Sequence, residues 1–185
     1  MTLHLSDVPP ALTMTFIGAY PMFTIVHLHL VLNHLPIIVT SLALLLVAIA
    51  AWNGNDYLAR VGLAFFIGGA LSALPTYLTG EGAEEAVEDL PGVSRNLIEQ
   101  HQDIALVAAL VIGVLGVLAA WTLWRYRRAA TVPRIIVRGM LVGGIVGASL
   151  MGYTGLLGGQ IRHSEVRAGY VAPARGAGGT GDISR

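Results

Sequence analysis

The chain has 185 residues and no formal net charge, and it combines 55% hydrophobic residues with only 12% charged ones. This composition is typical of a membrane protein and gives no sign of a nucleic-acid partner. The chain contains no cysteine, which excludes disulfides, thiolate metal sites, cysteine-ligated iron–sulfur clusters and covalently attached c-type haem.

Four stretches without charge are long enough to cross a hydrocarbon core of roughly 30 Å, which takes about 20 helical residues. They are Leu35–Trp52, Val61–Thr79, Ile104–Trp124 and Gly139–Ile161. Because short segments join them, the sequence predicts an all-α fold, an integral membrane four-helix bundle formed by residues 21–163. We expect residues 1–20 to be an uncleaved leader and residues 164–185 to be a flexible tail.

The two ends of the predicted bundle differ in charge. Four crossings place both termini at one end, with the loop 80–94, ten of the eleven carboxylates and all six histidines. We call this the histidine end. The opposite end, called the arginine end, comprises the turn "NGND" and the segment "RYRRAATVPR", and Asp56 is its only acid.

The positive-inside rule predicts the orientation of the bundle. The arginines that flank the arginine end are Arg60, Arg125, Arg127, Arg128, Arg134 and Arg138. This excess predicts that the arginine end is cytoplasmic and that both termini lie on the non-cytoplasmic side. Trp52, Trp121 and Trp124 also fall at the arginine end, as expected for an interfacial aromatic belt.

Four histidines from three predicted helices converge at one depth, and they are the candidate ligands: His29, His34, His101 and His163. A neutral imidazole is the commonest protein ligand for metals and also holds haem iron. His4 and His27 are expected to be structural or interfacial. Pro36 allows two arrangements: either a helix begins near His34, or it continues back through Val26 and kinks at Pro36.

The helix that carries His101 is predicted to begin near Ser94 or Asn96, where Asn96 and Glu99 have the spacing of a capping box. Small side chains follow on the face below His101. They leave room for a flat cofactor, or they let helices pack closely. The residues on this face are Ala105, Ala108, Ile112 and Gly116.

The last predicted helix carries a glycine stripe that favours helix packing, formed by Gly139, Gly143 and Gly147. A second glycine cluster precedes His163 and would let a planar group lie against backbone; its members are Gly152, Gly155, Gly158 and Gly159. Arg162 beside His163, and Arg95 in the loop at the histidine end, are candidates to pair with haem propionates.

An acidic run, "GEGAEEAVEDLPG", follows the second predicted helix. Glu81, Glu85 and Glu88 have the spacing of one helical face if the helix extends that far. Such a face is either solvated, or it supplies Glu84 or Glu85 as a metal ligand beside histidine.

Several motifs together resemble the family of small bacterial membrane proteins named domain of unknown function 2231. They are "HLVLNHLPI" at residues 29–37, "GALSALPTYLTGE", the histidine of "IEQHQD", and "GLLGGQIRH". Leu30 stands where the family usually has a proline after its first histidine, and the closing motif is shorter between "GG" and His163. The resemblance implies a multi-pass, four-helix protein of a bacterial inner membrane.

Three hypotheses about function follow. The first is a b-type cytochrome subunit that binds haem b near the periplasmic face through His34 and His101, with His29 and His163 as a second pair or as orienting donors. Its expected partners are the lipid bilayer and a quinol, a periplasmic cytochrome or a larger respiratory or photosynthetic complex.

The second hypothesis is a non-haem site for iron, copper or zinc. Its ligands would come from His34, His101, His163 and His29, together with Glu84 or Glu85. The third is a structural subunit without a cofactor, whose histidines only form hydrogen bonds.

Overall fold

The computed structural model describes residues 24–171, which form helices joined by turns and so confirm the all-α prediction. The predicted leader, most of the predicted tail and His4 lie outside the described residues. The elements are α2 (Ile25–Leu32), α3 (His34–Asn53), α4 (Asp56–Leu78), α5 (Gly80–Glu85), α6 (Arg95–Arg125), α7 (Arg134–Arg162) and the 3-10 turn η2 (Ser164–Val166).

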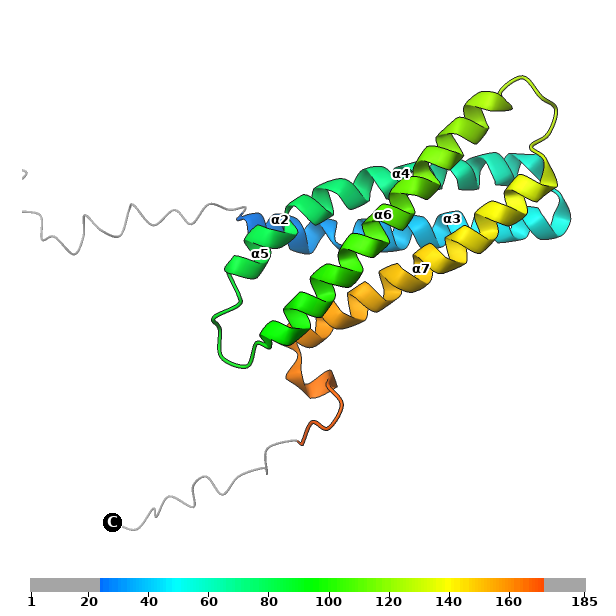
Figure 1. Cartoon of the computed structure of the whole chain (residues 1–185). Coiled ribbons are helices and arrows are strands. Elements are labelled where there is room, and N and C mark those ends of the chain that lie inside the picture. The colour runs from blue at the N-terminus through cyan, green and yellow to red at the C-terminus, as the bar shows by residue number, and fades with distance from the viewer. Residues whose placement is uncertain (1–23, 172–185) are drawn as a thin grey trace, which may run out of the picture.

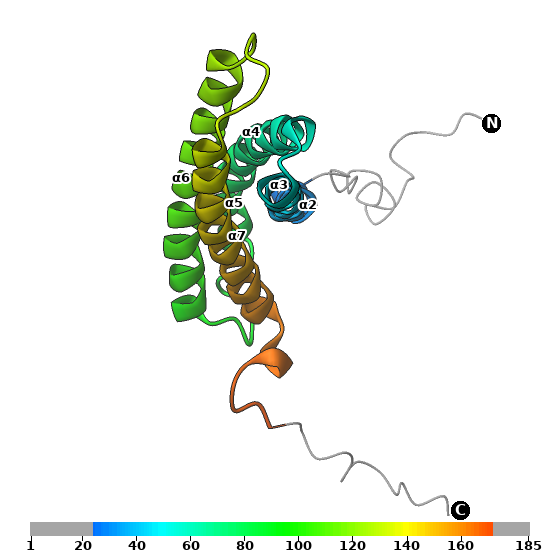
Figure 2. The same cartoon turned by 90° about the vertical axis from the view of Figure 1, so that its right-hand side faces the viewer.

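The long helices α3, α4, α6 and α7 form an up-and-down bundle. Each packs against the next in the chain, and α7 closes the bundle by packing against α3. Figure 2 shows α3 nearly end-on, with α6 and α7 side by side. The start of α2, α5 and the end of α7 lie at the histidine end, and the α3–α4 and α6–α7 connections lie at the arginine end (Figure 1).

Four helical stretches are long and apolar enough to cross a membrane, and the first of them joins α2 and α3. This confirms the four predicted spans. Each helix extends past its apolar window because charged residues such as Asp56 and Arg134 belong to the first helical turns. Large apolar side chains on every long helix, including Leu45, Leu110 and Val142, are exposed on the outer surface, as lipid contact requires.

The start of α6 is only partly as predicted. The hydroxyl oxygen of Ser94 accepts a hydrogen bond from the backbone N–H of Leu97, so Ser94 is the N-cap. The predicted capping box of Asn96 and Glu99 is wrong, since the side chain of Asn96 lies inside the helix and accepts a hydrogen bond from Gln100 instead.

The junction of α2 and α3 combines both arrangements that Pro36 allowed. Asn33 ends α2 and precedes α3 while keeping a right-handed helical conformation. Pro36 has no N–H, so it cannot donate to the carbonyl of Leu32 four residues earlier. The hydroxyl of Thr76 on α4 replaces that donor at 3.1 Å and also lies 2.9 Å from the carbonyl of Ser72. A side chain of α4 therefore fixes this junction.

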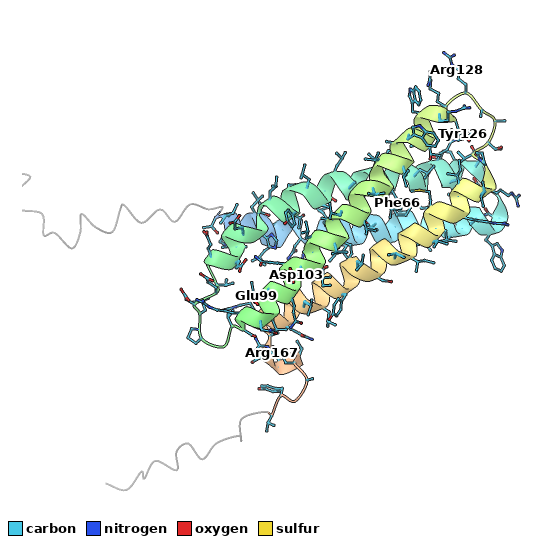
Figure 3. All side chains as sticks on the ribbon, viewed as in Figure 1. Phe66, Glu99, Asp103, Tyr126, Arg128 and Arg167 are labelled. Carbon is cyan, nitrogen blue, oxygen red and sulfur yellow. The ribbon has the colours of Figure 1, made fainter. Side chains whose placement is uncertain are left out.

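Small residues bring the four helices close together. A Cβ added to Gly116 would lie 2.4 Å from the Cβ of Ala70, and one added to Gly147 would lie 2.6 Å from Ile112. Phe66, on α4, fills the middle of the bundle and is fully buried (Figure 3). The lower part of the face below His101, at Ala108, Ile112 and Gly116, is therefore buried in helix packing.

This packing predicts opposite results for two glycines of α6. Gly116→Ala should lower the free energy of unfolding by about 1–3 kcal/mol, because the added methyl group meets Ala70. Gly113→Ala, whose Cβ would have nothing within 4 Å, should be neutral or stabilising by up to about 1 kcal/mol. Thermal melting of the purified protein in detergent checks both, and equal effects would contradict the packing described.

Candidate functional site

His29 is held by the end of α4. Its ring Nδ1 lies 3.1 Å from the backbone carbonyl oxygen of Thr76 and 3.1 Å from the hydroxyl oxygen of Thr79. The Thr79 hydroxyl lies 2.9 Å from the carbonyl of Pro75 and 3.0 Å from that of Thr76, so its hydrogen is directed to those oxygens. The carbonyl of Thr76 belongs to the last turn of α4, where a helix lacks donors of its own.

His101 is held in the same manner by α7. Its Nδ1 lies 3.0 Å from the carbonyl oxygen of Thr154, one lone pair of which remains available inside a helix. Gly158 makes this approach possible, because a Cβ at that position would lie 3.1 Å from Cε1 of His101. The glycine cluster of α7 therefore seats a histidine ring here.

The two contacts fix which ring nitrogen carries the proton. A carbonyl oxygen can only accept a hydrogen bond, so Nδ1 must donate in both rings. In the neutral imidazole, Nε2 then carries a lone pair. A histidine that binds a metal is usually oriented in this way, with its second nitrogen donating to a carbonyl or a carboxylate.

His29 on α2 and His101 on α6 lie at the same end of the bundle, and both residues are half-buried. Asn33, one helical turn after His29, has a buried Oδ1 with no hydrogen-bond partner among residues 24–171. We call His29, His101 and Asn33 the histidine site.

The other histidines have different surroundings. His34 is exposed at the start of α3, and no hydrogen bond of its ring is found among the described residues. His27 is exposed, and its Nδ1 lies 2.8 Å from the hydroxyl of Thr24, the N-cap of the same helix. His163 follows the end of α7, and its Nδ1 lies 2.7 Å from a carboxylate oxygen of Glu165 in an exposed contact. The predicted pairing of His34 with His101 is therefore not a contact of this structure.

The acidic run is only partly helical, since α5 ends at Glu85 and Glu88 lies in the following turns. The predicted carboxylate face of Glu81, Glu85 and Glu88 does not form as one helix. Glu84 accepts a hydrogen bond from Gln102 and so joins α5 to α6. Glu85 is exposed.

The two arginines predicted near the site differ in their pairing. Arg95 donates to Asp89 at 2.7 Å and lies 4.0 Å from Glu88. Arg162 is exposed and has no ion pair among the described residues.

Arg167, which the sequence did not single out, donates to backbone carbonyls of α7 and of Gly92 at 2.8–2.9 Å. Figure 3 labels Arg167 at this end, near Glu99 and Asp103 of α6.

Sequence reasoning missed the groups that orient the two rings. Thr76, Thr79 and Thr154 contribute through carbonyl or hydroxyl oxygens, and threonines in apolar helices carry no metal-site signal of their own. Gly158, one helical turn after Thr154, is the one sequence feature that hinted at a close approach. Within residues 24–171, no group of three or more histidine, aspartate or glutamate side chains is placed to hold a metal ion.

Glu84 makes the stability of this end depend on pH. Its partial burial and the negative charges of Glu88, Glu81 and Glu85 raise the pKa of the Glu84 carboxyl, although the hydrogen bond from Gln102 lowers it. The fold therefore favours the protonated form. The resulting stability is complete below the ordinary glutamate pKa of about 4.3 and is lost as the pH rises through the raised pKa.

Glu84→Gln should therefore melt at a higher temperature than the wild type at neutral pH, because its amide oxygen still accepts from Gln102 without a charge. The difference should shrink as the pH falls towards the ordinary glutamate pKa. Thermal melting across the acidic range checks this, with Glu99→Gln, exposed on α6, as the control. A gain that is the same at every pH would contradict this role of the charge.

Comparison with known proteins assigns the chain to one family. The family described as "Predicted membrane protein (DUF2231)" matches residues 26–166, a range that includes His29, Asn33 and His101. Neither a curated protein nor a solved structure matches the chain. The resemblance seen in the motifs is thus confirmed over most of the sequence, and the chain belongs to the DUF2231 family of membrane proteins.

Proposed function

We propose that this membrane protein binds haem b at the histidine end and serves as an electron-transfer subunit. The observation that carries the proposal is the pair His29 and His101. Two half-buried imidazoles from different helices each donate Nδ1–H to a backbone carbonyl, which leaves Nε2 free. We therefore favour His29 and His101 as the ligand pair, in place of the predicted pair of His34 and His101.

The donor set fits haem. The porphyrin supplies four nitrogen ligands to the iron, so two protein imidazoles complete its coordination. Zinc or non-haem iron needs three or more protein ligands, which would have to include a group such as Glu84 as well as the two histidines. The number of nitrogen donors in the histidine site therefore favours haem over the alternative metals.

Two further features support a planar ligand at this end. The buried Oδ1 of Asn33 lacks a described donor, as expected beside a site that receives another group. On α7, a Cβ at Gly159 or at Gly152 would meet nothing within 4 Å, so the backbone there is accessible. Arg162 is the better candidate for a propionate, because Arg95 already pairs with Asp89.

A bound haem would supply one-electron exchange between ferric and ferrous iron. The residues of this chain would hold and orient it. The carbonyls of Thr76 and Thr154 fix the two ring planes and increase the basicity of Nε2. The apolar surroundings would limit access by water. All candidate groups lie at one end, so electrons would be exchanged with a partner at that side, such as a quinol, a periplasmic cytochrome or a larger respiratory or photosynthetic complex.

The orientation predicted from the arginines belongs to the same proposal. It places the histidine site on the periplasmic side of a bacterial inner membrane, with the arginine end in the cytoplasm. A reagent that labels only one face, applied to intact cells with single cysteines introduced at each end, tests it. Labelling at the arginine end from outside would reverse the proposed orientation.

The absorption spectrum of the full chain, produced with ample haem, tests the cofactor directly. The purified protein should show a Soret band that shifts on reduction with dithionite, together with sharp alpha bands. His29→Ala and His101→Ala should each abolish or shift this spectrum. His27→Ala is the matched control, since His27 lies in the same helix but is exposed and pairs only with Thr24, and it should leave the spectrum unchanged.

The remaining outcomes separate the alternatives. Recovery of the spectrum of the alanine variants by added imidazole would distinguish lost ligation from misfolding. Loss of the spectrum in His34→Ala but not in His29→Ala would restore the pairing predicted from the sequence. If no Soret band appears, the haem proposal fails. Elemental analysis then decides between a non-haem metal site and a structural subunit in which the histidines only join helices.

A further inference from the structure

The arginine end contains a cleft that the histidine site does not use. It has a volume of about 340 Å³ and lies where the end of α3, the start of α4, the α6–α7 connection and the first turns of α7 meet. This volume is within the usual range for small-ligand sites, roughly 300–1,000 Å³. Its walls combine small apolar residues, such as Ala50 and Ala59, with the two arginines Arg134 and Arg138.

Arg134 and Arg138 lie four residues apart on α7 and therefore share a face. Neither forms an ion pair or a side-chain hydrogen bond with any residue that the structure describes, although two other arginines of this end, Arg60 and Arg127, do donate hydrogen bonds. The guanidinium of Arg134 lies against the backbone of Gly54. A Cβ on this residue, which has a φ of 72°, would lie 2.5 Å from an Nη atom of Arg134. The cleft thus holds two cationic groups whose donors are available.

The one carboxylate in the cleft is already neutralised. Asp56 accepts hydrogen bonds from Nε of Arg60 and from the backbone N–H of Val132, one on each carboxylate oxygen. The remaining charge of the cleft is positive. An arginine guanidinium presents several donors in a planar fork that matches the oxygens of a phosphate, and all eleven basic residues of the chain are arginines.

The tryptophans of this end indicate its depth. Trp52, Trp121 and Trp124 are exposed by 92%, 52% and 61%, and exposed tryptophans of membrane helices concentrate at the level of the lipid headgroups. Figure 3 shows Tyr126 and Arg128 at the same end, on the connection that leads into α7. The tryptophans therefore indicate that this end lies at the level of the lipid headgroups, which is where lipid phosphates are found.

We propose that this cleft binds a phosphate group between Arg134 and Arg138, and that the phosphate comes from the headgroup of an anionic membrane lipid. Basic pockets between the ends of membrane helices bind anionic headgroups in this way. The apolar wall of Ala50, Ala59 and Val137 would contact the glycerol and the first part of the acyl chains.

The test measures lipid retained by the purified full chain in native mass spectrometry, and the shift of its melting temperature. The probes are phosphatidylglycerol, a galactolipid that lacks phosphate, and inorganic phosphate at matched ionic strength. The wild type should retain phosphatidylglycerol in preference to the galactolipid. The double variant Arg134→Gln with Arg138→Gln should lower this retention roughly tenfold or more.

Arg128→Gln is the matched control, because Arg128 is exposed in the same connection and does not line the cleft. It should leave retention unchanged. An equal loss in Arg128→Gln, or equal retention of the two lipids by the wild type, would overturn the proposal. In a third outcome, inorganic phosphate raises the melting temperature of the wild type, but not of the double variant, and displaces the lipid. That result would keep the phosphate site but overturn the lipid as its ligand, since the phosphate bound would be the free ion. If the double variant unfolds, the single variant Arg138→Gln is used instead, because Arg138 is exposed. It should likewise retain less phosphatidylglycerol than Arg128→Gln.

Discussion

The structure of the histidine end depends on one constraint: a carbonyl oxygen freed within an apolar bundle must find a donor inside the protein. Pro36 frees the carbonyl of Leu32, and Thr76 supplies its donor from α4. The end of α4 leaves the carbonyl of Thr76 without a backbone donor, and His29 from α2 donates to it beside the hydroxyl of Thr79. The two helices are thus joined by reciprocal hydrogen bonds, which hold the ring of His29 in one orientation. His101 is oriented from α7 by the same kind of contact.

The two ends of the bundle offer different chemistry because the same helices are charged differently where they leave the membrane. At one end, His29 and His101 are half-buried, and the Nε2 atom of each ring has a lone pair that can accept a hydrogen bond or bind a metal. At the other, two arginines face a cleft whose only carboxylate is already paired. The middle is filled by residues such as Phe66 and Ile112, both fully buried, and it contributes stability without any evident chemistry. A site for a cofactor and a site for a lipid can therefore coexist without sharing a residue.

Much of the fold could be predicted from the sequence, because a span of about 20 residues without charge has few other interpretations. The gathering of the described histidines at one end followed from the same topology, whereas the start of α6 was left open between Ser94 and Asn96. The sequence could not predict which of two histidine rings, His29 or His34, points into the bundle. His29 and His34 are five residues apart, which is about 140° around a helix, so only one of them can face His101. That choice depends on the junction at Asn33 and on the register with Thr76, and neither is a local property of the sequence.

The proposed haem site requires that His29 and His101 donate Nδ1–H to carbonyls and leave Nε2 unprotonated. Nitrogen-15 NMR of the full chain labelled in histidine tests this claim directly, with single His→Ala variants to assign the resonances. At neutral pH without added haem, both rings should show a protonated Nδ1 and a bare Nε2, whereas the exposed His34 should exchange between tautomers. A neutral ring with the proton on Nε2 in place of Nδ1 at either His29 or His101 would contradict this assignment, because that ring could then neither donate to its carbonyl nor bind iron.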